Sequence, residues 1–189
     1  MKRDIKRLVA AADDALLRVD NPLHRRILEN YRLHAIFEVA GSWEQIFTPD
    51  MTVEHPIYNV EGPNGRMTLE GHDAVTGFYR QLVDLGMNVM AVEDEELAVA
   101  DWGFASQYRV HVYLRGSALP DGDPDKFYVQ SRLICMHWPY DEHGRMIGET
   151  VYEDPRETTV VEVPENEFIT PAEARAQLLP LVRPLPVLV

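Results

Sequence analysis

The run Trp102-Gly-Phe-Ala-Ser-Gln-Tyr-Arg-Val-His-Val-Tyr-Leu114 combines aromatic and β-branched residues with a partial alternation of apolar and polar side chains. Residues of these types fit a pleated, half-buried surface, so the run predicts a β-strand. Runs of the same character lie at residues 89–99, 127–138 and 146–153. Gly, Pro and Asp residues at 116–125 and the run Asp141-Glu-His-Gly144 indicate hairpin connections. The second half of the chain is therefore predicted to form a mostly antiparallel sheet.

The first half of the chain is predicted to be mainly helical. Apolar residues recur at helical spacing over residues 3–18, and Asn21-Pro22 places a preferred cap and a first-turn proline before a helix that ends at Gly41. Helices followed by a run of strands indicate an α+β fold, with a curved sheet around the N-terminal helices and a pocket between them. The remaining elements predicted in this half are a short helix at 43–47, a strand at Met51–Tyr58, a turn at Gly62–Gly65 and a helix from His72, with Asp73 as its cap.

We expect one domain with an extension at each end. Residues 1–20 form a helical extension and residues 21–155 form the α+β domain. Residues 156–189 form a C-terminal extension. Within that extension, Thr158–Val163 is predicted as an edge strand and residues 171–179 as a short helix, followed by a Pro-rich apolar tail that we expect to pack on this domain or on a neighbour.

Composition excludes several partners. The 189 residues carry a formal net charge of -13, which opposes binding to nucleic acid or to an anionic membrane. Asp13 and Asp14 interrupt the apolar stretch after the basic start, so we expect neither an export signal nor a membrane-spanning helix. Cys135 is the only cysteine, which precludes an intrachain disulfide and favours the cytoplasm. Its apolar neighbours predict a buried, unreactive thiol.

His55 is the leading candidate for chemistry. It ends the short run Val53-Glu-His-Pro56, where a proline stops the strand. A histidine has an ordinary pKa of ~6.5, so a modest change in surroundings lets it accept or donate a proton at neutral pH. A solvated histidine at a strand end is the alternative interpretation.

Four runs together resemble a known family. They are Gly41-Ser-Trp-Glu-Gln-Ile-Phe-Thr-Pro-Asp50, Val53-Glu-His-Pro56, Glu70-Gly-His-Asp-Ala-Val-Thr-Gly-Phe-Tyr79, and Asp141-Glu-His-Gly-Arg-Met-Ile-Gly-Glu149 continuing to Asp154. Over residues 22–155 the chain resembles a SnoaL-like member of the nuclear-transport-factor-2-like superfamily. The resemblance implies a cone-shaped α+β barrel with an internal pocket. Because this superfamily includes isomerases, cyclases, dehydratases, an epoxide hydrolase and binding proteins, the site must decide the function.

The resemblance also implies site residues. His55 matches the general-base position of ketosteroid isomerase, and either Tyr31 or His34 matches the tyrosine that hydrogen-bonds an oxyanion. Met136 replaces the second acid of that oxyanion hole, which argues against the same steroid reaction. Arg109-Val-His111 resembles the Arg-x-Asp pair of the epoxide hydrolase branch, although Val151 stands where its last acid is expected.

Strand parity completes the set of candidates. Alternation places Arg109, His111 and Tyr113 on one face of their strand, and this face is predicted either to line the pocket or to point outward. The resemblance points Glu149 toward the cavity, where burial would raise its pKa. No pair of histidines has metal-ligand spacing, so we expect no metal and no cofactor. The full prediction is His55, Tyr31, His111 and Glu149 as catalytic residues and His34, Tyr58, Arg109 and Trp138 as substrate-binding residues.

The expected function is acid–base catalysis without a cofactor on a small hydrophobic cyclic molecule, as in an isomerase, cyclase or dehydratase. The alternatives are a ligand-binding protein without turnover and an epoxide hydrolase. The resemblance further implies a homodimer formed through the open sheet face, to which the apolar tail adds surface.

Overall fold

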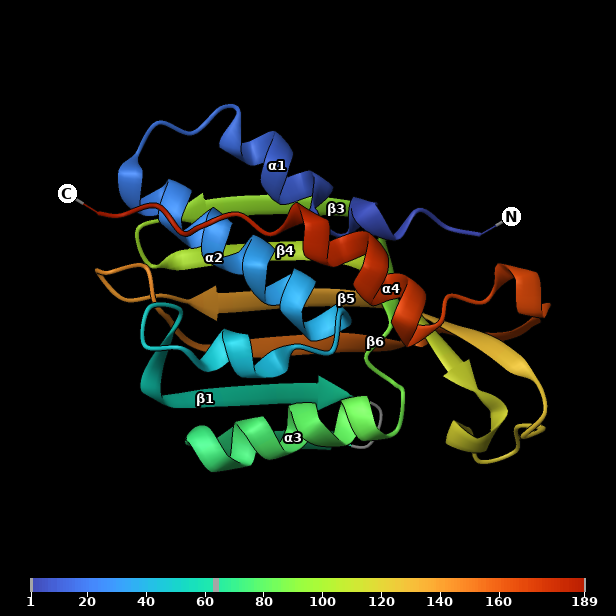
Figure 1. Cartoon of the computed structure of the whole chain (residues 1–189). Coiled ribbons are helices and arrows are strands. Elements are labelled where there is room, and N and C mark those ends of the chain that lie inside the picture. Colours follow the sequence, from blue (N-terminus) through green and yellow to red (C-terminus); the bar gives the residue numbers. More distant parts are fainter. Residues whose placement is uncertain (1, 63–64, 189) are drawn as a thin grey trace.

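The structure is a computed structural model that describes residues 2–62 and 65–188. One six-stranded sheet curves around a long helix, which confirms the predicted α+β class (Figure 1). The strand order is β2-β1-β6-β5-β4-β3, and every neighbouring pair is antiparallel except β1 and β6. The strands are β1 (Thr52–Gly62), β2 (Gly65–Glu70), β3 (Met90–Ala100), β4 (Gly103–Arg115), β5 (Phe127–Pro139) and β6 (Met146–Val163).

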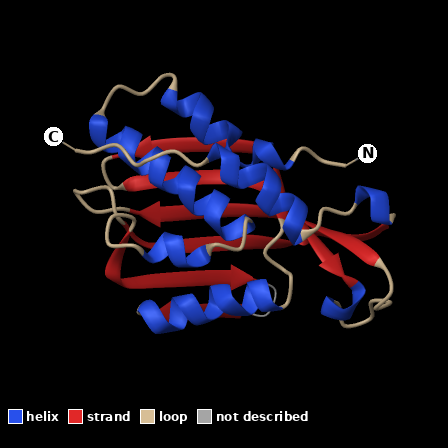
Figure 2. Ribbon diagram, in the orientation of Figure 1, coloured by secondary structure: helices blue, strands red, loops and turns tan. Residues whose placement is uncertain are grey.

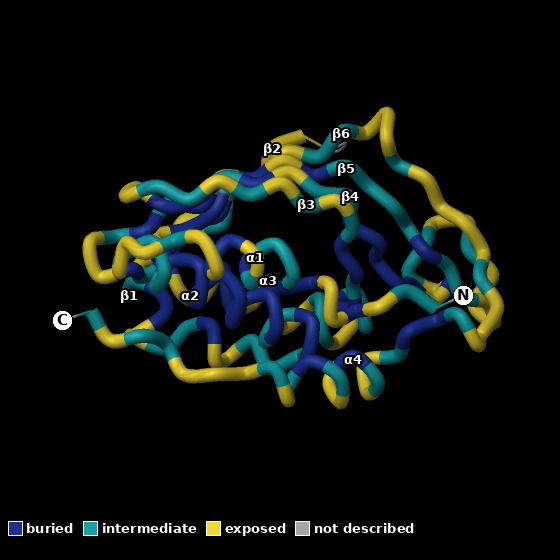
Figure 3. The backbone as a smooth tube through the Cα atoms, turned by 90° about the horizontal axis from the view of Figure 1, so that it is seen from above, coloured by how far each residue is buried: buried dark blue, intermediate teal, exposed yellow. Residues whose placement is uncertain are grey.

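The helices lie over one face of the sheet (Figure 2). Helix α2 runs between the sheet and α4, so α4 lies on the far side of α2 from the strands (Figure 3). No helix among the described residues has the length and apolar character needed to span a membrane. The α-helices are α1 (Ala10–Leu16), α2 (Pro22–Val39), α3 (His72–Asp84) and α4 (Pro171–Leu178), and the 3-10 helices are Ile5–Val9, Trp43–Phe47, Gly116–Ala118, Glu165–Glu167 and Leu179–Leu181.

Local sequence explains where α2 begins and ends. The Asn21 side chain accepts hydrogen bonds from the backbone N–H groups of Leu23 and His24, as predicted, and Pro22 occupies the first turn. Gly41 follows the helix with φ of 65°, a conformation that glycine adopts without strain. Helix α3 differs from the prediction, because Gly71 rather than Asp73 precedes its first residue and no side chain caps it.

Strand β6 is longer than predicted. Residues Thr158–Val163 are not a separate strand, because they continue β6; they pair with β5 from Thr159 to Val163, whereas the pairing of β6 with β1 ends at Tyr152. The ladder between β5 and β6 breaks between Ser131 and Leu133, opposite the β6 segment that contains Pro155. Proline has no N–H for a ladder, so the irregularity carries the chain past it without ending the strand.

Two further predictions about the sheet differ from the structure. Strand β2 was not predicted, since its residues are mostly exposed and show no alternation of burial. The predicted turn at Gly62–Gly65 includes residues 63 and 64, which lie outside the described residues. Cys135 is exposed and not buried, because Ile134 and Met136, its neighbours of opposite parity, point into the core.

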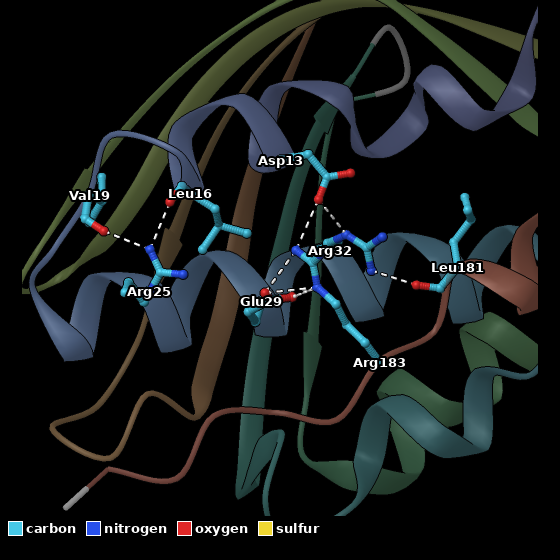
Figure 4. Close-up of polar contacts among 8 residues, drawn as sticks. All are labelled: Asp13, Leu16, Val19, Arg25, Glu29, Arg32, Leu181 and Arg183. Carbon is cyan, nitrogen blue, oxygen red and sulfur yellow. Dashed lines mark hydrogen bonds and ion pairs between the residues drawn. The ribbon is translucent and has the colours of Figure 1, made fainter.

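Both chain ends pack against α2. Ile5, Leu8 and Val9 share an apolar core cluster with Phe168 and with residues of α2, β3 and α4. On the same side, the buried Arg32 of α2 binds the Asp13 carboxylate at 2.8 Å and the Leu181 carbonyl at 2.8 Å (Figure 4). These contacts hold the C-terminal tail on its own domain.

Candidate active site

Ten polar or aromatic side chains gather between α2 and the concave face of the sheet. Ring contacts, hydrogen bonds and electrostatic effects on one another's pKa connect them. Three come from one face of α2, where intervals of three and four residues align side chains. This interior cluster consists of Tyr31, His34 and Glu38 of α2, Tyr58 of β1, Tyr79 of α3, Glu95 of β3, Tyr108 of β4, Trp138 of β5, Tyr140, and Glu149 of β6.

His34 lies at the centre of the interior cluster as a neutral imidazole. Its Nε2 is 2.8 Å from the Tyr79 hydroxyl and 3.8 Å from Glu38 Oε2, and its ring centroid is 4.5 Å from that of Trp138. Burial lowers the pKa of His34 to about 3. The side chain therefore remains neutral at working pH and exchanges hydrogen bonds without adding a charge.

Glu38 and Glu149 are two buried carboxyl groups with perturbed acidity. Burial raises the pKa of Glu38 to about 7, although 20% of its side chain remains exposed. Burial, and then the charge of Glu38, raise the pKa of Glu149 well above its usual value. At neutral pH Glu38 divides between its two forms, while the raised pKa of Glu149 favours its protonated form, which is a suitable arrangement for a base and an acid.

Two tyrosines surround these acids. Tyr58 pairs with Glu149 across the parallel β1–β6 ladder, and its ring contacts that of Tyr79 with centroids 6.1 Å apart. Burial and the neighbouring glutamates raise the pKa of both phenols, so each stays protonated and can donate a hydrogen bond. The Tyr58 hydroxyl donates to the sulfur of Met146, a weak acceptor 3.7 Å away, and shares a hydrogen bond with the Tyr79 hydroxyl.

Glu95 enters the interior cluster through an irregularity of β3. The β3–β4 register shifts between Glu93 and Glu96, and Asp94 has φ of 55°. Glu95 accepts a hydrogen bond from the Tyr31 hydroxyl at 2.7 Å. Burial raises the pKa of Glu95 to about 6, which that hydrogen bond partly opposes. A run of four acidic residues that suggests a solvated segment therefore contributes one acid to the interior.

His55 lies outside the interior cluster. Its side chain is 65% exposed, and its Nε2 is 3.3 Å from Glu70 Oε1. It lines an open cavity of about 870 Å³ together with Phe47, Glu70 and His72. The Phe47 ring contacts both His72 and Tyr79, with centroids 5.7 and 5.6 Å apart, and thus stands between this cavity and the interior cluster.

Arg109 and His111 also lie apart from the interior cluster. Val110 and Val112 point into the interior core, so strand parity turns Arg109 and His111 to the opposite face. Arg109 binds Glu157 at 2.9 Å, whereas His111 is buried between Glu93 and Ser131. The possibility that this face lines the pocket is therefore wrong.

The structure brings together five of the eight predicted site residues, and it adds others that the sequence analysis did not propose. Glu38 and Tyr79 had a detectable signal, because each lies on the inward face of a helix beside apolar residues. Glu95 had none, since the shift in β3 reverses its parity. Among the described residues, no group of three or more His, Cys, Asp or Glu side chains is arranged to hold a metal ion. The residues brought together are Tyr31, His34, Tyr58, Trp138 and Glu149.

Comparison with known proteins identifies the fold. No protein-family model matches the sequence, and no curated protein sequence matches it significantly. The structure is similar to a protein named as a SnoaL-like polyketide cyclase from Jannaschia sp. CCS1, with 15% identity, a TM-score of 0.54, and coverage of 72% of this chain and 91% of that one. It is also similar to a phenazine biosynthesis-related protein from Pseudomonas aeruginosa, with 12% identity, a TM-score of 0.50, and coverage of 77% and 86%. The chain thus has a SnoaL-like, nuclear-transport-factor-2-like fold.

Proposed function

We propose that the protein is a cofactor-independent acid–base enzyme acting on a small hydrophobic cyclic molecule, of the isomerase, cyclase or dehydratase type. The interior cluster is its active site. The observation that carries the proposal is the pair Glu38 and Glu149, two carboxyl groups in the same buried surroundings with different protonation at neutral pH. Pairs of acids whose environments separate their pKa values are typical of acid–base catalysis.

The two acids take different roles. Glu38, with a pKa of about 7, removes a proton from a carbon next to a carbonyl group of the substrate. Glu149, in its neutral form, donates a hydrogen bond to the oxygen on which negative charge develops. Tyr58 provides a second donor nearby, and His34 holds the Tyr79 hydroxyl in place. A general base and an oxyanion donor each contribute on the order of 100-fold or more to the rate.

The aromatic side chains in and around the interior cluster favour a hydrophobic ring as substrate. The rings of Tyr31, Phe104 and Trp138 contact one another with centroids 4.4 to 5.5 Å apart. Trp138 Nε1 and the Tyr140 hydroxyl are buried and have no hydrogen-bond partner among the described residues. Buried donors of this kind are normally paired, so an oxygen acceptor on a ligand would satisfy them.

His55 keeps a proposed role at the entrance and not at the reacting atoms. The cavity that it lines is separated from the interior cluster by Phe47, and we propose that substrates enter there. We also propose a homodimer formed through the outer sheet face, where Tyr152 and Val161 are 52% and 58% exposed. Light scattering on wild type and Tyr152→Asp tests this, since an unchanged mass in the variant would remove this face from the interface.

Exchange of carbon-bound hydrogen tests the enzyme proposal without knowledge of the natural substrate. Cyclic ketones such as 2-tetralone and 1-indanone are incubated with the protein in D₂O, and incorporation of deuterium is followed by NMR. Glu38→Gln should lower the enzyme-dependent rate by about 100-fold or more, because the base is lost. Glu142→Gln is the matched control, since that side chain is 88% exposed.

Two results would count against the proposal. Equal exchange with wild type and Glu38→Gln would remove Glu38 as the base. Tight binding of ketones with no exchange above the buffer rate would favour the alternative, a ligand-binding protein without turnover.

A further inference from the structure

A chain of hydrogen bonds crosses three strands away from the interior cluster. The Ser131 hydroxyl of β5 lies 2.7 Å from His111 Nδ1 of β4, and His111 Nε2 lies 3.0 Å from Glu93 Oε2 of β3. Arg3 donates to the other oxygen of Glu93 at 3.1 Å. His111 and Ser131 are direct partners in the β4–β5 ladder, so their side chains share one face of the sheet.

The three hydrogen-bonded side chains have the protonation states of a nucleophile (Ser131), its base (His111) and an acid that orients the base (Glu93). Burial alone would raise the pKa of Glu93, but His111 and Arg3 together lower it below the usual range. Burial, followed by the charge of Arg3, lowers the pKa of His111. A neutral His111 that donates its Nε2–H to the Glu93 carboxylate keeps the Nδ1 lone pair for the proton of Ser131.

The surroundings of Ser131 differ from those of an ordinary ladder residue. His111 is only 3% exposed, whereas Ser131 is half-buried, so Ser131 is the more accessible of the two residues. The β5–β6 register breaks directly after Ser131, and such irregularities are frequent beside active sites. A cavity of about 550 Å³ lies beside the neighbouring strand β3. Its lining includes Ala91 and Glu93 of that strand and Arg3. Arg109 lies two residues before His111 on the same face.

We propose that Ser131 is the nucleophile of a second site that accepts acyl groups from small esters, with His111 as its base and Glu93 as the residue that orients His111. Ser131 Oγ attacks the acyl carbon while its proton moves to His111 Nδ1. The bond from the acyl carbon to the leaving alcohol breaks, and His111 returns the proton to that alcohol. Water then attacks the acyl-serine, with His111 again carrying the proton, which releases the carboxylic acid and restores Ser131.

A fluorophosphonate probe tests the nucleophile directly. Ser131 Oγ bonds to phosphorus and fluoride leaves, so intact-protein mass spectrometry should show one adduct, which peptide mapping places on Ser131. Ser131→Ala should abolish the adduct. His111→Gln should slow labelling by about 100-fold, the usual size of a general-base contribution. Ser117→Ala is the matched control, because Ser117 is exposed, and it should label at the wild-type rate.

Further measurements keep the test decisive. Hydrolysis of p-nitrophenyl acetate should show a burst of nitrophenolate that disappears in Ser131→Ala and slows in Glu93→Gln, while circular dichroism confirms that each variant is folded. An unlabelled wild type overturns the proposal, as does labelling that persists in folded Ser131→Ala. Labelling of Ser131 at the same rate in folded His111→Gln would overturn the role of His111 as the base.

Discussion

Replacing Glu38 by glutamine should stabilise the protein, and the gain should increase with pH. The carboxyl has an ordinary pKa of 4.5 in the unfolded chain and about 7 in the folded protein. Between these values the folded state holds a proton that the unfolded state has released, so stability is lost as the pH rises through this window. At about 1.36 kcal/mol per pKa unit, the loss above pH 7 amounts to roughly 3 kcal/mol. Glutamine cannot ionise, so the Glu38→Gln variant does not lose this stability as the pH rises.

Thermal unfolding at two pH values measures the effect. Both are chosen above the isoelectric point of about 4.9, where the protein carries net negative charge. From pH 5.5 to pH 8.5 the advantage of Glu38→Gln over wild type should grow by about 2 kcal/mol. For a chain of this size that is a growth of about 4 to 8 °C in the difference between the two melting temperatures.

The control for this experiment is Glu142→Gln, which also removes one carboxylate but at an exposed position. The difference between its melting temperature and that of wild type should be the same at both pH values. If Glu38→Gln shows an equal shift at pH 5.5 and pH 8.5, or a loss of stability at pH 8.5, the inferred burial of an ionisable carboxyl at position 38 is refuted. The measurement needs no substrate, so it tests the acid independently of the proposed reaction.

Three further substitutions test the parts of the fold that position the site. Gly148→Ala should prevent folding or lower the free energy of unfolding by about 3 kcal/mol or more, because the added Cβ would lie 1.9 Å from the Ile57 carbonyl oxygen. Urea denaturation measures the loss, and a fully stable variant would contradict the tight β1–β6 contact. Asp94→Val should lower stability by about 1 to 2 kcal/mol relative to Asp94→Gly, because only glycine adopts φ of 55° without strain, and equal urea midpoints would show that this conformation is not required. Arg183→Ala should lower stability by about 1 kcal/mol, because it leaves the Glu29 carboxylate, which is 9% exposed, without its partner. The effect is limited because the Arg183 side chain is 43% exposed. An unchanged urea midpoint would show that this pair does not hold the tail.

Much of the fold follows from patterns that the sequence displays openly. Asn21-Pro22 marks the start of α2, and the four runs rich in β-branched and aromatic residues became β3, β4, β5 and β6. The prediction failed where a local rule was overridden by the sheet as a whole. The predicted strand at 146–153 stops just before Pro155, yet a break in the ladder lets β6 continue to Val163. An exposed edge such as β2 has no burial pattern to detect.

Whether a site residue could be predicted depended on knowing which face of its helix or strand points inward. The resemblance proposed Tyr31 or His34 for a single role, and the helical period accounts for both facing the interior from α2. Arg109 and His111 could not be oriented from alternation alone, because alternation defines two faces without stating which one is inside. His55 and Tyr58 are three residues apart in β1, so alternation places them on opposite faces, and the structure buries Tyr58 and exposes His55.

The features that break local rules meet in one place, and this supports the interior cluster as the active site. Glu38 and Glu149 have their acidity altered mainly by burial, and apart from the neutral His34 no basic side chain among the described residues pairs with either. Glu95 reaches Tyr31 only because Asp94 adopts a conformation unusual for a residue with a side chain. Each of these lowers stability, and apolar side chains of similar volume would remove the charge penalty. Stability alone therefore does not explain the arrangement, whereas proton transfer in a dry pocket requires buried acids with altered pKa values.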